Sequence, residues 1–285
     1  MHTQEISIQT ANGAMLAATV FFPENLRGAV MMAPATGIPR RFYRPFAEYL
    51  AAQGFGVVTY DNEGIGGSLN GHIRDCSASL VSWGRNDMTA VLAELQALFP
   101  DSGYHLIGHS AGGQLVGLME NAADLQSLFN VACSSGSVRN MAMPFRAKAA
   151  FFMSVFIPVS NRLFGCAHNE WIGMGATLPR NVARQWSEWC LGTGYVRTAF
   201  GREVGGHLYD TLAMPARWLF AVDDDIATEA NVDDMISVFT AMPSEKKKLL
   251  PNEQGLKEIG HMKFFSRQSH KLWPLAVDWL VSNGA

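Results

Sequence analysis

The stretch from Tyr104 to Gly117 reads YHLIGHSAGGQLVG and decides the fold. Its first residues, 104–107, predict a short β-strand, and the letters QLVGLM after the glycines predict the start of a helix. Gly108 and Gly112 would let strand and helix approach closely across a sharp turn that has Ser110 at its apex. A turn that only reversed the chain would not need a serine there. The stretch therefore predicts a nucleophilic Ser110 at the carboxyl edge of a sheet.

Strand and helix patterns alternate on both sides of this turn. The Asn12-Gly13 turn signal joins the first two predicted strands into a hairpin. Alternation of this kind predicts a mostly parallel central sheet with helices on both faces, an α/β fold. The predicted strands are 5–10, 15–22, 28–35, 55–60, 104–107, 129–133, 217–222 and 247–250, and the predicted helices are 42–53, 81–98, 112–121 and 264–282.

One region interrupts the alternation. Residues 137–214 show no strand pattern but several helical patterns rich in Met, Phe and Trp. We interpret this region as a helical cap, or lid, inserted into a core domain formed by residues 1–136 and 215–285. The alternative is a set of additional helices in the layers that cover the sheet.

Composition excludes several classes of protein. The net charge is −3 and no basic run exceeds Lys246–Lys248, so we expect no nucleic-acid partner. The longest apolar run, 147–159, contains Lys148 and Ser154 and is too short to span a bilayer. The start of the chain lacks the pattern of a secretory signal, and the four cysteines lack paired spacing, which favours reduced thiols in a cytoplasmic protein.

Metal and cofactor motifs are also missing from the sequence. No group of His, Cys, Asp and Glu has metal-ligand spacing, so we expect no metal and no cofactor. The run Gly64-x-Gly66-Gly67 follows a predicted strand, but no helix with an acidic residue at the required distance comes after it. We therefore expect a structural loop there, and not a phosphate-binding loop.

The letters GHSAGG on a strand–turn–helix resemble the nucleophile elbow of the α/β-hydrolase superfamily. The stretches ATGIPRRFYRPFAEYLAAQGF, YDNEGIGGS, LPRNVARQWSEWC and IGHMKFF more narrowly resemble bacterial predicted hydrolases related to the serine aminopeptidase and monoacylglycerol-lipase-like branch. The resemblance extends over nearly the whole chain. It implies the α/β-hydrolase fold and a catalytic triad in the chain order nucleophile, acid, histidine.

A serine hydroxyl needs a general base to take its proton. The superfamily's chain order rules out as general base the histidines that lie before the elbow or within the cap. The side chain of His109 should point away from its neighbour Ser110. Two candidates remain. His270 lies inside the predicted closing helix, whereas His261 lies in a loop after the last predicted strand. We therefore predict His261 as the base, and the resemblance implies the same residue.

The acid should follow the predicted strand 217–222, where three aspartates stand in a row, Asp223, Asp224 and Asp225. Members of the superfamily usually carry a glycine three residues before the acid. Ala221 occupies that position here, so the resemblance points to Asp224 and leaves the other two as loop residues.

Two backbone N–H groups should bind the oxyanion of the transition state. One is that of Ala111, which follows the nucleophile. The superfamily's usual His-Gly is absent after the predicted strand 28–35, where Pro34-Ala35-Thr36-Gly37 stands instead. Pro34 has no N–H, which leaves Ala35 or Thr36. Alignment on the following FYRPFAEYLA favours Thr36.

These residues predict a serine hydrolase that cleaves carboxylic esters through an acyl-enzyme. A high density of Met and Phe between positions 141 and 156 suggests an apolar ester substrate with a medium-sized acyl group. One alternative keeps the triad and changes the bond to an amide, a thioester or a lactone, or transfers the acyl group. Another is a non-catalytic binding protein with a hydrolase-like fold, which would have a decayed triad.

Overall fold

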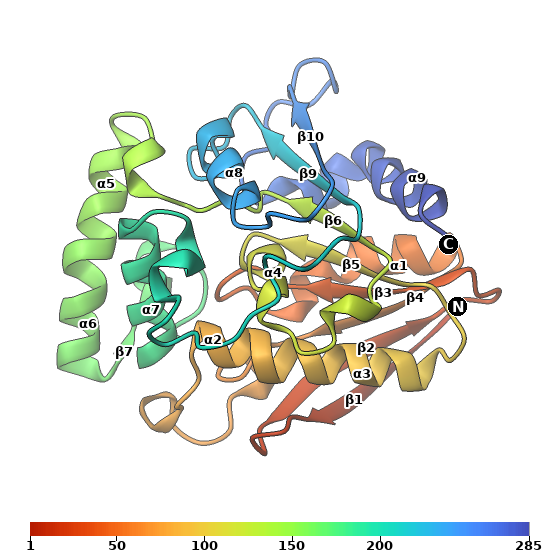
Figure 1. Ribbon diagram of the computed structural model, residues 1–285, viewed down its shortest axis with the longest axis horizontal. Helices are drawn as coiled ribbons and strands as arrows, with labels where there is room; N and C mark the ends of the chain where they lie inside the picture. Colours follow the sequence, from red (N-terminus) through yellow and green to blue (C-terminus); the bar gives the residue numbers. More distant parts are fainter. Residues whose placement is uncertain (285) are drawn as a thin grey trace.

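The computed structural model describes residues 1–284 of the chain. Its centre is an eight-stranded sheet with the order β1-β2-β4-β3-β5-β6-β9-β10 (Figure 1). From β4 to β10 every neighbouring pair is parallel, whereas β1–β2 and β2–β4 are antiparallel. The strands are β1 His2–Gln9, β2 Met15–Phe22, β3 Gly28–Ala33, β4 Phe55–Tyr60, β5 Tyr104–His109, β6 Ser127–Val131, β9 Ala216–Ala221 and β10 Ser244–Leu249.

Helices cover both faces of this sheet. Figure 1 shows α3 in front of the strands and α1 and α9 behind them. The ring of Phe46 in α1 packs against those of Phe264 and Trp273, which ties α1 to the C-terminal segment. The helices are α1 Arg44–Ala52, α2 Leu80–Ser82, α3 Thr89–Leu98, α4 Ala111–Gln114, α5 Phe145–Phe151, α6 Ile157–Phe164, α7 Arg180–Leu191, α8 Glu229–Ile236 and α9 Pro274–Ser282.

The predicted hairpin is present. β1 and β2 pair from His2–Phe22 to Gln9–Met15, and the turn between them closes with a hydrogen bond from Thr10 N–H to the Ala14 carbonyl. Gly13 has a φ of +87°, a conformation that glycine adopts at no steric cost. The Asn-Gly signal therefore predicted the position of the turn correctly.

The predicted helix 112–121 is wrong in length. Helix α4 ends at Gln114, and one 3-10 turn, Val116–Leu118, follows it. The Tyr209 hydroxyl donates to the Gln114 carbonyl, and Leu208 N–H donates to the Gly117 carbonyl. A distant segment thus occupies carbonyl groups that a continuing helix would use, because tertiary contacts override the local preference.

The closing helix predicted at 264–282 is also divided. The 3-10 segments Lys263–Phe265 and Arg267–Leu272 precede α9, which begins at Pro274. Proline lacks the N–H that a preceding helical turn would bond, so it favours the first position of a new helix.

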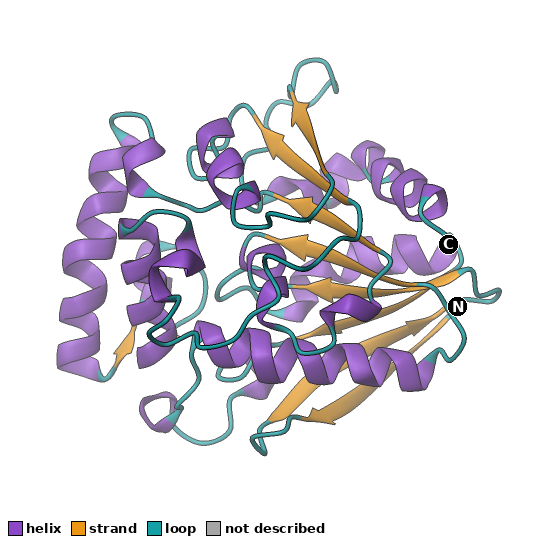
Figure 2. Ribbon diagram, in the orientation of Figure 1, coloured by secondary structure: helices purple, strands orange, loops and turns teal. Residues whose placement is uncertain are grey.

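Between β6 and β9 the chain forms mainly helices. α5, a π-helical turn at Phe152–Phe156 and α6 run on continuously, and α7 packs beside them. Contrary to expectation, the region also contains a short antiparallel pair, β7 Cys166–Ala167 and β8 Leu178–Pro179. Figure 2 shows these helices beyond the carboxyl ends of the parallel strands. Within residues 1–284, no helix is long and apolar enough to cross a membrane.

Candidate active site

Ser110 stands at the turn between β5 and α4, as the sequence predicted. Its backbone has φ +50° and ψ −114°, a conformation that residues other than glycine rarely adopt. Ser110 N–H donates to the Val131 carbonyl at 3.0 Å, and the Ser110 carbonyl accepts from Gly113 and Gln114. Hydrogen bonds to both neighbouring elements therefore hold the strained residue in place.

The glycines around Ser110 make this turn possible. A Cβ at Gly108 would lie 2.5 Å from the Gly113 nitrogen, and one at Gly112 would lie 2.1 Å from the Ala33 carbonyl oxygen at the end of β3. A Cβ at Gly113 would meet Asn130 at 2.3 Å. Backbone cannot move aside as a flexible side chain can, so β3, β5 and α4 pack this closely only because these side chains are absent.

His261 and Asp224 are brought together by the loops after β10 and β9. Nδ1 of His261 lies 2.8 Å from Oδ2 of Asp224. The other carboxylate oxygen accepts from Ile226 N–H and Ala227 N–H at 2.8 and 2.9 Å. Burial alone would raise the pKa of Asp224, but the adjacent His261 and these hydrogen bonds outweigh it and hold the pKa below its usual value. An ionised Asp224 fixes the ring proton of a neutral His261 on Nδ1 and leaves Nε2 free to accept a proton.

Asp223 has a role that its sequence position did not reveal. Its carboxylate accepts from Ile259 N–H at 2.9 Å and from Gly260 N–H at 3.1 Å. The two neighbouring aspartates therefore hold the same loop. Asp223 binds backbone N–H groups of the loop, and Asp224 binds the ring of His261. The sequence had indicated only an ordinary loop residue at Asp223.

The His261 loop is also bonded to the elbow. Nε2 of His109 lies 2.8 Å from the His261 carbonyl oxygen, and the two rings have centroids 5.6 Å apart. His261 is thus held against the residue that precedes Ser110. Within the described residues no hydrogen bond joins the Ser110 hydroxyl to Nε2 of His261, a bond that in active sites often tightens only when substrate is bound.

His109 itself lies in a hydrogen-bonded chain of defined direction. The His261 carbonyl can only accept, so Nε2 of His109 carries the proton and Nδ1 is an acceptor. The Tyr43 hydroxyl lies 2.8 Å from Nδ1 and accepts from Ala35 N–H at 2.9 Å. Burial, with a smaller contribution from the nearby His261, lowers the pKa of His109 to about 3 and keeps it neutral. We call Ala35, Tyr43, His109 and the His261 carbonyl the Tyr43 relay.

The Tyr43 relay helps to decide whether Ala35 or Thr36 is the better candidate for the second N–H donor to the oxyanion. Ala35 N–H is engaged by Tyr43, whereas within residues 1–284 neither Thr36 N–H nor Ala111 N–H forms a hydrogen bond. Ile38 N–H donates to the Ala35 carbonyl, which closes a turn with Gly37 at φ +71°. Thr36 is partly exposed in this turn, so it is accessible to a ligand.

The loop YDNEGIGGS holds the segment that follows the Thr36 turn. Asp61 is 1% exposed and accepts from the backbone N–H groups of Arg40 and Gly67. It also forms an ion pair with the Arg40 guanidinium. A Cβ at Gly66 would lie 2.6 Å from the Asp61 carboxylate. The glycines of this loop thus pack against a buried carboxylate that anchors the segment after Thr36.

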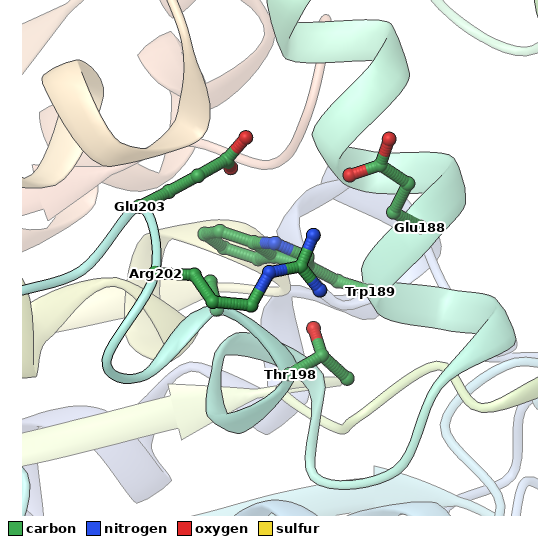
Figure 3. Close-up of a pocket in the computed structure, with 6 residues that line it drawn as sticks. Glu188, Trp189, Thr198, Arg202 and Glu203 are labelled. Atoms are coloured by element: carbon green, nitrogen blue, oxygen red, sulfur yellow. The ribbon is translucent and has the colours of Figure 1, made fainter.

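A separate pocket of about 160 Å³ lies between α7 and the segment that follows it (Figure 3). Its lining contains none of the predicted catalytic residues and consists of Glu188, Trp189, Thr198, Ala199, Arg202 and Glu203. In α7, Trp186 and Trp189 pack against Phe152 and Tyr195 respectively. In the described part of the chain, no group of three or more His, Cys, Asp and Glu residues could hold a metal ion.

Solved structures similar to this chain include several esterases. An esterase from Pyrococcus furiosus has a TM-score of 0.65 and 12% identity, covering 100% of this chain and 92% of that one. A carboxyl esterase from Bacillus coagulans, solved with glycerol, has a TM-score of 0.65 and 14% identity, covering 100% of both chains. A soluble variant of monoglyceride lipase from Saccharomyces cerevisiae, solved with a substrate analog, has a TM-score of 0.65 and 13% identity, covering 99% of this chain and 97% of that one.

These likenesses confirm the predicted α/β-hydrolase fold with its mostly parallel sheet. A search of curated proteins found no match. The model of the serine aminopeptidase S33 family matches residues 24–170, which is more than half of the chain. The chain belongs to the serine aminopeptidase S33 family.

Proposed function

We propose that the protein is a serine hydrolase that cleaves carboxylic esters with Ser110 as nucleophile, His261 as general base and Asp224 as the acid that orients it. One observation carries the proposal. His261 contacts Asp224 at 2.8 Å, and its loop is bonded by His109 directly to the turn that carries Ser110. Family membership and the esterase-like fold support hydrolysis as the reaction class.

In the proposed reaction Nε2 of His261 takes the proton of Ser110 while Oγ attacks the ester carbonyl. The tetrahedral intermediate collapses, the alcohol leaves with the proton from His261, and an acyl-enzyme remains. His261 then activates a water molecule that releases the acid. Asp224 keeps the ring proton on Nδ1 and stabilises the imidazolium formed in each step.

The N–H groups of Ala111 and Thr36 would bind the oxyanion. Both lack a partner in the described part of the chain, and Ala35, the competing candidate, donates to Tyr43 instead. The close approach of Gly112 to Ala33 supports this pairing, because it sets the start of α4 against the end of β3, which leads into the Thr36 turn. Loss of one such donor typically lowers kcat about 100-fold to 1000-fold.

Residues 137–214 would form a cap over a core of residues 1–136 and 215–285. The position of α5 to α7 beyond the carboxyl ends of the strands supports this division (Figure 2). The apolar acyl pocket rests on fewer residues than the sequence suggested. Met143 and Phe151 are 70% and 61% exposed, whereas Met141 and Phe152 are buried and remain available to line an apolar cavity.

The test is a series of p-nitrophenyl esters from acetyl to dodecanoyl, with Ser110→Ala as the control. We expect the highest kcat/KM between butyryl and octanoyl and no activity above background in the variant. Acetyl ester cleaved far better than butyryl would contradict the acyl preference. A folded wild-type protein that cleaves no ester would contradict the proposed reaction.

A second candidate, hydrolysis of aminoacyl amides, has one observation in its favour, the serine aminopeptidase family model. It uses the same triad and differs only in the leaving group. Aminoacyl p-nitroanilides measured beside the esters separate the two, because an aminopeptidase would cleave the anilides with the higher kcat/KM. Acyl thioesters in the same series test the thioester alternative.

A further inference from the structure

The continuous helix from α5 to α6 presents an apolar face to solvent. Phe151 and Leu163 are 61% and 66% exposed, and between them Val155 and Val159 are 43% and 48% exposed. Residues spaced by four share one face of a helix. Figure 1 shows α5 and α6 at the left edge of the molecule, farther from the sheet than α7.

The apolar face continues at both ends of this helix. Met143, just before α5, is 70% exposed, and Trp171 and Ile172, shortly after α6, are 60% and 48% exposed. The Trp171 ring packs against Phe164 with centroids 5.3 Å apart, which keeps it beside the end of α6. The helix, 145–164, is about 30 Å long at 1.5 Å per residue. We call the following set the α5–α6 surface: Met143, Phe151, Val155, Val159, Leu163, Trp171 and Ile172.

The charges along the helix 145–164 are all basic, and the one acidic residue beside the surface, Glu170, contacts His168 at 2.9 Å. Lys148 and Arg162 are exposed near the two ends of the helix, and Arg146 is exposed near its start. The sequence between Asp124 and Glu170 contains no acidic residue. These cations therefore remain available to an anionic partner. The Arg and Lys ion pairs of the described residues use other cations, namely Arg40, Arg44, Arg184, Arg217, Lys246, Lys248 and Lys263.

Charge also argues against a second copy of this chain as the partner. Most homodimers are two-fold symmetric, so the same patch faces itself. Two copies of the helix packed antiparallel about Val155 would bring Lys148 of each close to Arg162 of the other. Like charges at the edge of a desolvated contact oppose that packing.

A phospholipid surface fits both the apolar residues of the α5–α6 surface and the basic residues of the helix. Amphipathic helices that lie in a membrane interface bury an apolar face shallowly and keep Lys and Arg among the headgroups. Tryptophan favours the same depth, because its ring is apolar and its N–H is polar. The helix itself does not qualify as a membrane span within the described chain.

We propose that the α5–α6 surface docks the protein on membranes that contain anionic phospholipids, with the 145–164 helix parallel to the bilayer plane. The inference rests on this surface alone and is independent of the chemistry proposed for Ser110. Lys148 and Arg162 supply attraction to the anionic headgroups, and the apolar residues supply burial.

Flotation of the full-length protein with vesicles tests the proposal. Vesicles of phosphatidylcholine with about 30% phosphatidylglycerol should bind at least tenfold more tightly than pure phosphatidylcholine, and the difference should shrink with salt. Lys148→Gln/Arg162→Gln should weaken binding to the anionic vesicles about 30-fold. Phe151→Ser/Leu163→Ser should weaken binding to both vesicle types by about tenfold or more.

Matched controls change the same residue types elsewhere. Leu26 and Val281 are 47% and 40% exposed outside the patch, so Leu26→Ser/Val281→Ser should bind like the wild type. Lys257→Gln/Arg267→Gln removes two exposed cations from other segments and should also leave binding unchanged. Wild-type protein that floats with neither vesicle overturns the proposal. So does a dimer that Phe151→Ser/Leu163→Ser dissociates, if no vesicle binds.

Discussion

His109 is adjacent to the nucleophile candidate Ser110, but its side chain bonds to the segments that surround the site. Both ring nitrogens are engaged, one with Tyr43 and one with the His261 carbonyl, so the ring is not free to act as the base. The Tyr43 relay instead links the turn that carries Thr36 to the loop that carries His261. We interpret Tyr43 and His109 as positioning residues.

Replacing Tyr43 with Phe tests this interpretation. The variant leaves Ala35 N–H and Nδ1 of His109 buried without a partner, which should lower the free energy of unfolding by about 1–3 kcal/mol. Because Ala35 precedes Thr36, we also expect kcat on the best ester to fall about tenfold with little change in KM. Urea unfolding and ester kinetics measure the two effects.

Tyr49→Phe is the matched control for this variant. Tyr49 lies on α1, which directly follows Tyr43, and packs its ring against Trp273 with centroids 5.3 Å apart, while its hydroxyl forms no hydrogen bond within residues 1–284. Equal kinetics for the two variants would show that the Tyr43 hydroxyl does not position the site.

The sequence was sufficient to propose candidate catalytic residues and insufficient to identify the residues that hold them in place. Ser110 and His261 could be predicted because a turn motif and the chain order single them out. Asp223 and Tyr43 could not, because nothing in their local sequence shows which distant N–H groups their side chains meet. Alignment already favoured Thr36 over Ala35, and the hydrogen bond from Ala35 N–H to Tyr43, which only the fold reveals, adds support for that choice.

At the scale of elements, β3, β5 and α4 pack closely around the turn that carries Ser110. The prediction concerns Gly112→Ala, which places a Cβ 2.1 Å from the Ala33 carbonyl oxygen, a backbone atom. Either β3 or α4 must move, so we expect the free energy of unfolding to fall by about 3 kcal/mol or more, as measured by urea unfolding.

Gly205→Ala provides the comparison, because nothing lies within 4 Å of a Cβ at that position. It should change the free energy of unfolding by no more than about 0.5 kcal/mol. If Gly112→Ala were equally mild, the tight contact between β3 and α4 would not be required by the fold.

Elements with strong local signals were predicted well, and those shaped by distant contacts were not. The β1–β2 hairpin follows from alternation and an Asn-Gly turn within one short segment. Helix α4 is shorter than predicted because Tyr209 and Leu208, nearly a hundred residues away, take its carbonyl groups. No local pattern in YHLIGHSAGGQLVG encodes those bonds.

At the scale of the whole molecule, two histidines buried in the neutral form make stability depend on pH. Burial lowers the pKa of His105 to about 4 and, with a contribution from His261, that of His109 to about 3. In the unfolded chain both would titrate near 6.5, so below that pH the unfolded state binds more protons. Their contribution to stability is therefore complete above about pH 6.5 and is lost as the pH falls toward 4.

We expect the free energy of unfolding to fall by about 1.4 kcal/mol per pH unit for each of these histidines between pH 6 and pH 4.5. His105→Asn keeps a polar group beside Ser127 and should remove about half of that slope. His270→Asn changes an exposed histidine and should leave the slope as it is in the wild type. Equal slopes in all three proteins, measured by urea unfolding across this range, would contradict the assignment.

A mostly parallel central sheet could be predicted from alternation and from the superfamily resemblance, but the outward face of α5 and α6 could not. The same Met and Phe residues that suggested a substrate pocket divide between the interior and the solvent, as Phe152 and Phe151 do. A count of Met and Phe residues cannot separate these faces, because it ignores their positions. Regular helical spacing does not separate them either, because a π-helical turn at Phe152–Phe156 shifts the periodicity.

Fluorophosphonate labelling followed by intact-mass and peptide analysis tests the central claim most directly, since the probe reacts with a serine only where a base activates it. We predict one adduct per chain, on the peptide that contains Ser110, its absence in Ser110→Ala and a rate about 1000-fold or more lower in His261→Ala. A folded wild-type protein that remains unlabelled, or a His261→Ala variant labelled at the wild-type rate, would contradict the account.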